Sequence, residues 1–192
     1  MRGERFFKLD QTTKKNRKGQ VWVETVIYTL IALVVIGIFV SFAKPKIEEI
    51  QDKAIIEQSV GMLEDLNDIT LSLTQGGSGN QRIIDIGIKK GQLTLDGIND
   101  KIIFELEGRY SYTEPGQNGQ PGSPVNIGNI IATTQKKGDR YTVTLTSDYS
   151  NYNITYNNID NFKTLFKAPS PYKITIANRG EIGGVTVIDF KI

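Results

Sequence analysis

The chain has 192 residues, of which 39% are apolar and 23% charged, and it contains neither histidine nor cysteine. This composition excludes the usual transition-metal sites, cysteine nucleophiles, Ser-His catalytic triads and disulfide bonds. The formal net charge of +2 is unevenly distributed, because residues 1–19 carry +5 and the rest of the chain carries −3. The sequence also lacks a nucleophile elbow, a phosphate-binding glycine loop and an HExxH motif, so we expect no enzymatic activity, no metal and no cofactor.

The N-terminal region joins a basic segment to a long apolar one. Residues 26–43 are eighteen consecutive residues without a formal charge, which is the usual length for a transmembrane helix candidate. As a helix, residues 21–43 would be roughly 34 Å long, about the hydrocarbon thickness of a bilayer. The basic segment predicts a cytoplasmic N-terminus, with everything after Lys44 outside. Nuclear localisation or nucleic-acid binding through residues 14–18 is the disfavoured alternative, because this cluster adjoins the span and no basic face recurs, so no nucleic acid is expected as a partner.

Residues 44–73 have the pattern of an amphipathic helix. The apolar positions follow one another mostly at spacings of three and four, with charged residues on the other faces; they are Ile47, Ile50, Ala54, Ile56, Val60, Leu63, Leu66 and Ile69. Pro45 would either open this helix or kink one long helix that includes the span. The glycine-rich residues 75–79 mark its end.

From Arg82 onward the apolar period changes to two, which is typical of β-strands. Eight short strands are predicted, separated by glycine-containing turns, at residues 83–88, 92–96, 101–107, 129–134, 140–147, 152–156, 172–178 and 185–192. Only residues 159–168 carry a pattern that would also suit a helix. We therefore expect an α+β chain: a leader at 1–19, a long transmembrane and amphipathic helix at 20–74, and an all-β sandwich or barrel-like head at 80–192.

The junction between the leader and the span resembles the processing site of archaeal type IV pilins. In that family a basic leader ends in Gly, a membrane peptidase cuts after this Gly, and the fifth mature residue is Glu. Here Lys18, Gly19 and Gln20 match the cleavage site, and Glu24 is fifth after it. Trp22 occupies a position that is usually Ser in the subgroup whose mature chains start with Gln.

The resemblance implies a structural subunit of a surface filament. Cleavage would create a positive α-amino group at Gln20, which in a packed filament would meet Glu24 of a neighbouring copy; cyclisation of Gln20 to pyroglutamate would remove that charge. A row of mostly small residues, including Thr25, Thr29 and Gly37, would let helices pack closely. The implied partners are further copies of the chain, the prepilin peptidase, an assembly ATPase with its membrane platform, and membrane lipid before assembly.

Several alternatives stay open at this point. The chain would also suit an archaellin-type filament subunit, a single-pass anchor for a β binding module that does not polymerise, or a secreted protein cut near residues 41–43. Asn153 lies in the sequon Asn153-Ile154-Thr155, which predicts N-glycosylation of an external head. Whether the filament serves adhesion, DNA uptake or motility is not encoded in a motif.

Overall fold

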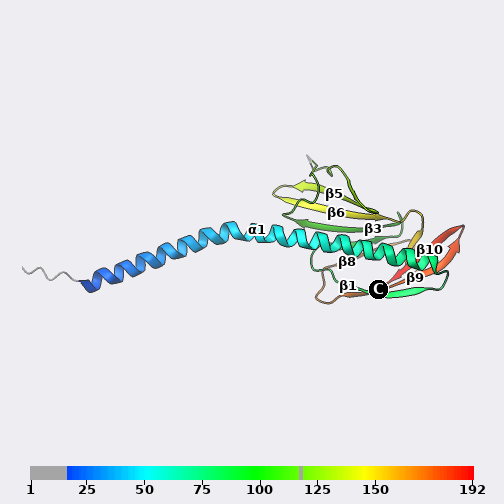
Figure 1. Ribbon diagram of the computed structural model, residues 1–192, viewed down its shortest axis with the longest axis horizontal. Coiled ribbons are helices and arrows are strands. Elements are labelled where there is room, and N and C mark those ends of the chain that lie inside the picture. Colours follow the sequence, from blue (N-terminus) through cyan, green and yellow to red (C-terminus); the bar gives the residue numbers. More distant parts are fainter. Residues whose placement is uncertain (1–16, 117–118) are drawn as a thin grey trace, which may run out of the picture. The chain divides into compact units, whose positions relative to one another are not determined.

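The computed structural model describes residues 17–116 and 119–192 (Figure 1). Most of the predicted leader, residues 1–16, lies outside this range. The chain divides into two compact units, with the boundary between Lys44 and Pro45. Each is described here by itself: an N-terminal stretch of helix, and a head that begins at Pro45.

Helix α1 runs from Arg17 to Gln75 and contains Pro45 in its interior. Pro45 therefore lies within one continuous helix and does not open a new one. The helix ends where its last carbonyl groups accept from donors that lie beyond its last residue. The carbonyl oxygen of Ser72 accepts from the amide of Gly76 at 3.2 Å, and that of Leu73 accepts from the side-chain amide of Asn178 at 2.9 Å.

The head contains two β-sheets. The first has four strands in the order β1-β9-β10-β7, which are β1 (Gln81–Ile86), β9 (Tyr172–Ile182), β10 (Val185–Lys191) and β7 (Asn153–Tyr156). Its strand pairs are antiparallel except for β10 and β7, which are parallel.

The second sheet has six strands, and all its strand pairs are antiparallel. Its order is β4-β5-β6-β3-β2-β8, which are β4 (Val125–Ile127), β5 (Ile130–Lys137), β6 (Arg140–Asp148), β3 (Lys101–Gly108), β2 (Gln92–Asp96) and β8 (Phe162–Phe166). The α+β class is therefore confirmed, and the head has two separate sheets, as in a sandwich, rather than one closed barrel.

The hydrophobic core joins the later turns of α1 to both sheets. Ile56, Leu63 and Leu66 of the helix belong to the same buried cluster as Phe104 of β3 and Phe190 of β10. The predicted apolar face of the helix is thus confirmed from Ile56 onward. Ile47 and Ile50 carry on the same spacing but are exposed, so the pattern begins two turns before the packing does.

Two strands differ from the sequence-based expectation. The helical alternative for residues 159–168 is wrong, because Phe162–Phe166 form β8 and pair with β2. Leu165 is buried opposite Leu93, while Phe162 and Phe166 on either side of it are exposed, which is the alternation of a strand. The short strand β4 was also not predicted; it lies between the strands predicted at residues 101–107 and 129–134.

Asp52 connects α1 to the sheet through a buried carboxylate. Only 1% of Asp52 is exposed, and its two oxygens accept from the ammonium group of Lys90 and, at 2.8 Å, from the backbone amide of Arg109. Gly108 precedes that amide, and a Cβ there would collide with the Asp52 carboxylate. The glycine therefore lets the end of β3 approach the helix closely.

Candidate assembly surface

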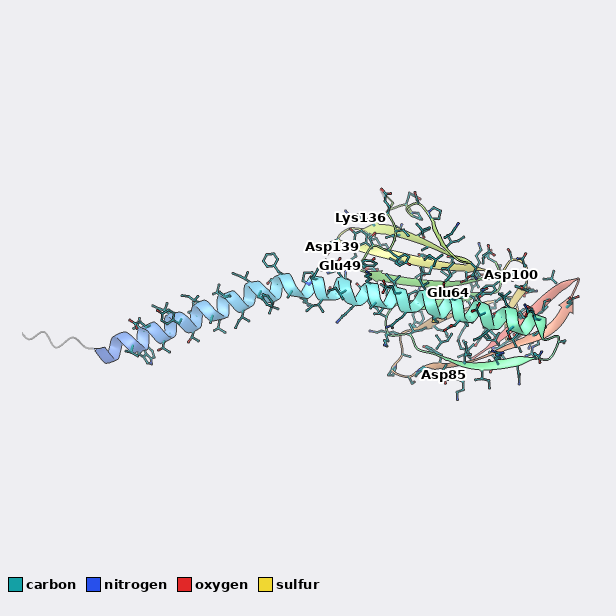
Figure 2. All side chains as sticks on the ribbon, viewed as in Figure 1. Glu49, Glu64, Asp85, Asp100, Lys136 and Asp139 are labelled. Carbon is teal, nitrogen blue, oxygen red and sulfur yellow. The ribbon has the colours of Figure 1, made fainter. Side chains whose placement is uncertain are left out.

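The N-terminal part of α1 presents an uninterrupted apolar surface. By length and composition this helix could span a membrane, and the apolar stretch is entirely exposed in the described chain. Figure 2 shows side chains projecting from both edges of the helix along this stretch. Trp22 near its beginning is 72% exposed, and Phe42 near its end is 76% exposed. An exposed apolar surface of this extent is typical of a membrane segment or of a protein interface.

The threonine and serine hydroxyl groups within this segment are satisfied by the helix itself. Thr25 donates to the carbonyl oxygen of Val21 at 2.9 Å, Thr29 to that of Thr25 at 2.8 Å, and Ser41 to that of Gly37 at 2.9 Å. A hydroxyl that bonds its own backbone four residues earlier needs no water. The helix can therefore carry these groups into hydrocarbon, or into contact with another apolar helix, without leaving a donor unpaired.

Gly37 leaves open space beside the helix. A Cβ at this position would meet nothing within 4 Å, so no contact in the described chain requires a glycine. Glycine inside a helix is nevertheless less favourable than alanine by about 1 kcal/mol. A residue without a side chain here allows a second helix to come close. Gly37, Thr25, Thr29 and Ser41 are each separated by a multiple of four residues, so they follow one row that winds slowly around the helix.

The predicted processing and assembly residues lie at the beginning of α1. The backbone of Lys18, Gly19 and Gln20 is helical, whereas their side chains lie outside the part of the chain that the structure describes. Glu24 is exposed and follows Trp22 and Val23, two exposed apolar residues. The helix thus places Glu24 in the same exposed segment as Thr25, Thr29 and Gly37.

Asn153 lies elsewhere, at the first position of β7 in the head. It is half-buried, and its strand pairs with β10. Thr155 of the same sequon is buried and donates its hydroxyl to Asp189 at 3.0 Å. Because both residues are held within the sheet, we expect that a glycan would have to be attached before β7 pairs with β10.

The head also contains a groove that sequence reasoning missed. It has a volume of about 580 Å³ and lies between α1 and β1, with Met62 and Ile69 of the helix facing Ile84 and Ile86 of the strand. Figure 2 labels Asp85, which lines this groove from β1. Only the pairing of distant segments creates this groove, so no local sequence pattern could have shown it.

The described residues contain no group of three or more acidic side chains placed to hold a metal ion. Models of known families, curated proteins and solved structures were compared with the chain, and none matches.

Proposed function

We propose that this chain is a structural subunit of a pilus-like surface filament, inserted in the membrane, cleaved after Gly19 and assembled through the N-terminal part of α1. The observation that carries the proposal is the apolar, fully exposed segment of residues 21–42 in a helix whose later turns belong to the core of a folded head. Such a segment needs an apolar environment at every stage of the protein's life.

The proposal gives the segment two successive environments. Before assembly, lipid surrounds the helix, with the N-terminus in the cytoplasm and the head outside the cell. In the filament, helices of other copies replace the lipid, and the row of small residues lets them pack closely. The exchange requires the partners that the resemblance implies: a prepilin peptidase, an assembly ATPase and its membrane platform. Adhesion through the exposed heads is the role we favour for the filament.

Glu24 receives a specific role in this proposal. The amine that cleavage creates at Gln20 is positively charged at neutral pH. In the apolar interior of the filament, this amine and the Glu24 carboxylate of a neighbouring copy would pair, and either one left alone would be strongly unfavourable. If Gln20 is converted to pyroglutamate, its ring amide N–H would donate to Glu24 instead. In both cases the contact fixes the register of one helix against the next.

Substitution of Glu24 tests the proposal. In the native cell, we expect Glu24→Ala to be processed after Gly19 as in the wild type, while filaments seen by electron microscopy disappear. Glu57→Ala is the matched control, because Glu57 is an exposed acidic residue of the same helix that makes a surface ion pair with Lys53 at 3.8 Å. Filaments of normal number and length from Glu24→Ala would refute the assembly role.

A further inference from the structure

The outward face of the six-stranded sheet places polar and aromatic side chains in a row. Residues directly opposite each other on antiparallel strands point to the same face of the sheet. The strand register therefore aligns one residue from each of five neighbouring strands, in the order Phe166, Gln92, Glu105, Thr144 and Thr133. Their neighbours along the strands, such as Leu93, Phe104 and Leu145, point to the other face and are buried in the core.

A cavity of about 360 Å³ opens on this face. It is lined by Gly91, Gln92, Glu105, Glu107, Lys137 and Thr142. Its volume is in the range of small-molecule sites, roughly 300–1,000 Å³. Figure 2 labels Lys136, the neighbour of Lys137 at the end of β5, and Asp139 in the turn that follows.

The polar groups of the cavity are held in place by the sheet. The side-chain amide of Gln92 donates to the Glu105 carboxylate at 2.7 Å. A Cβ at Gly91 would collide with the carbonyl oxygen of Glu105, so a glycine is needed for the close approach of the backbone at this edge. The Thr142 hydroxyl is inaccessible to solvent and has no hydrogen-bond partner in the described structure. A hydroxyl in this state is an unused donor and acceptor at the wall of a polar cavity.

One exposed aromatic side chain lies beside the cavity. Phe166, directly across from Gln92, is 59% exposed. The Phe166 ring is therefore open to solvent next to the cavity wall. A flat ring next to fixed polar groups offers contact to the C–H face of a ligand whose hydroxyl groups are bound at the same time.

We propose that this cavity and the adjoining Phe166 form a binding site for a neutral saccharide. Sugar hydroxyls both donate and accept, which matches carboxylate acceptors at Glu105 and Glu107 and donors at Lys137, Gln92 and Thr142. The Lys137 ammonium group disfavours a metal cation, and the two carboxylates disfavour phosphate or nucleic acid. The site does not depend on filament formation, because every residue in it belongs to the head of a single chain.

The test is a titration of the full-length chain in detergent micelles with maltotriose, cellotriose, mannotriose and triacetylchitotriose, followed by NMR. We expect at least one of these sugars to shift the resonances of Gln92, Glu105 and Thr142 in a saturable way. Glu107→Gln, which changes an exposed side chain, should weaken binding by about tenfold to a hundredfold, because it replaces a hydrogen bond to a charged group by one to a neutral group. Phe166→Ala should weaken it as well.

The controls are Glu181→Gln and Ile182→Ala at the end of β9, which remove an exposed carboxylate and an exposed apolar side chain from the other sheet. Both should bind like the wild type. The site is refuted if none of the four sugars gives saturable shifts, or if Glu107→Gln binds as tightly as the control variants. Should Phe166→Ala fail to fold, Glu107→Gln alone decides.

Discussion

At the scale of single residues, Asp52 is the clearest case of a charge that the fold uses for structure. It lies on the largely apolar face by which α1 packs against the sheets of the head, and both of its oxygens accept from donors. A buried carboxylate is tolerated only when it is paired in this way. Arg109, whose backbone amide is one of those donors, extends the contact by donating its side-chain Nε to Glu48 at 2.8 Å.

Asp52→Asn should therefore destabilise the head. The neutral amide would weaken the interaction with Lys90 and place an N–H group near other donors, for an expected loss of about 1–3 kcal/mol in the free energy of unfolding. Chemical denaturation of the full chain in micelles measures this loss. Lys53→Ala is the control, because its ion pair with Glu57 is exposed and should contribute less than about 1 kcal/mol. Equal stability of Asp52→Asn and the wild type would contradict the role given to Asp52.

Tyr149 makes the head less stable at high pH. Burial raises the pKa of Tyr149 well above its ordinary value of 10.0, Thr70 offsets the rise in part, and Asp68 adds to it. The unfolded chain then releases the phenolic proton at a lower pH than the folded chain does. The associated stability is fully present below pH 10.0 and is lost progressively as the pH rises above that value.

We expect the free energy of unfolding to fall above about pH 10, and to fall less steeply in Tyr149→Phe. The difference between the two slopes isolates Tyr149 from the other tyrosines and from the lysines. Denaturation midpoints measured at several alkaline pH values would show it. Parallel pH profiles for the two proteins would mean that Tyr149 ionises equally easily in the folded and unfolded states.

At the scale of elements, Gly61 lies in the part of α1 that belongs to the head, and the space that a side chain would occupy there is open. A Cβ at Gly61 would meet nothing within 4 Å, and the residue lines the groove between α1 and β1. Because alanine favours a helix more than glycine does, Gly61→Ala should raise the free energy of unfolding by about 0.5–1 kcal/mol. Thermal unfolding measures this gain. A lower melting temperature would show that the groove needs the glycine, for instance for a bound partner or a closer packing than the open space suggests.

The strands show what local sequence patterns can and cannot predict. The period of two located β2 at the residues observed, and β3 and β6 within one residue, because these strands alternate between the core and solvent. It did not separate strand from helix at β8, where five residues are too few for the two periods to differ clearly. The pairing of β8 with β2 decides its conformation, and this contact joins segments about seventy residues apart in sequence.

The two surfaces for which a function is proposed also differ in how far the local sequence predicts them. The apolar segment of α1 is contiguous, so composition alone predicted it, and the structure adds the hydroxyl bonds and the open space at Gly37. The cavity beside Gln92 needs residues from four strands in the observed register. Glu105 and Glu107 lie two residues apart in the strand predicted at 101–107, and alternation therefore places them on one face. No local pattern, however, brings Lys137 and Thr142 to them.

At the scale of the whole molecule, the proposed function gives the protein two successive forms, a precursor and a cleaved mature chain. Residues 1–19 carry +5, and in the proposed function this charge would keep the N-terminus of the precursor in the cytoplasm. Removal of these residues would leave a chain with a net side-chain charge of −3 and a new amine at Gln20, so that Glu24 is the fifth residue. The same cut therefore ends the topological role of the leader and completes the charge pair proposed for assembly.

The N-terminal mass of the protein isolated from its native membrane or cell surface tests this account most directly. The account predicts a chain that begins at Gln20, either as a free amine or as pyroglutamate. A chain that begins at Met1 would instead indicate a permanent membrane anchor for the β head, and one that begins at Lys44 would indicate a secreted domain. Either of those two results would contradict cleavage after Gly19 and the role assigned to Glu24.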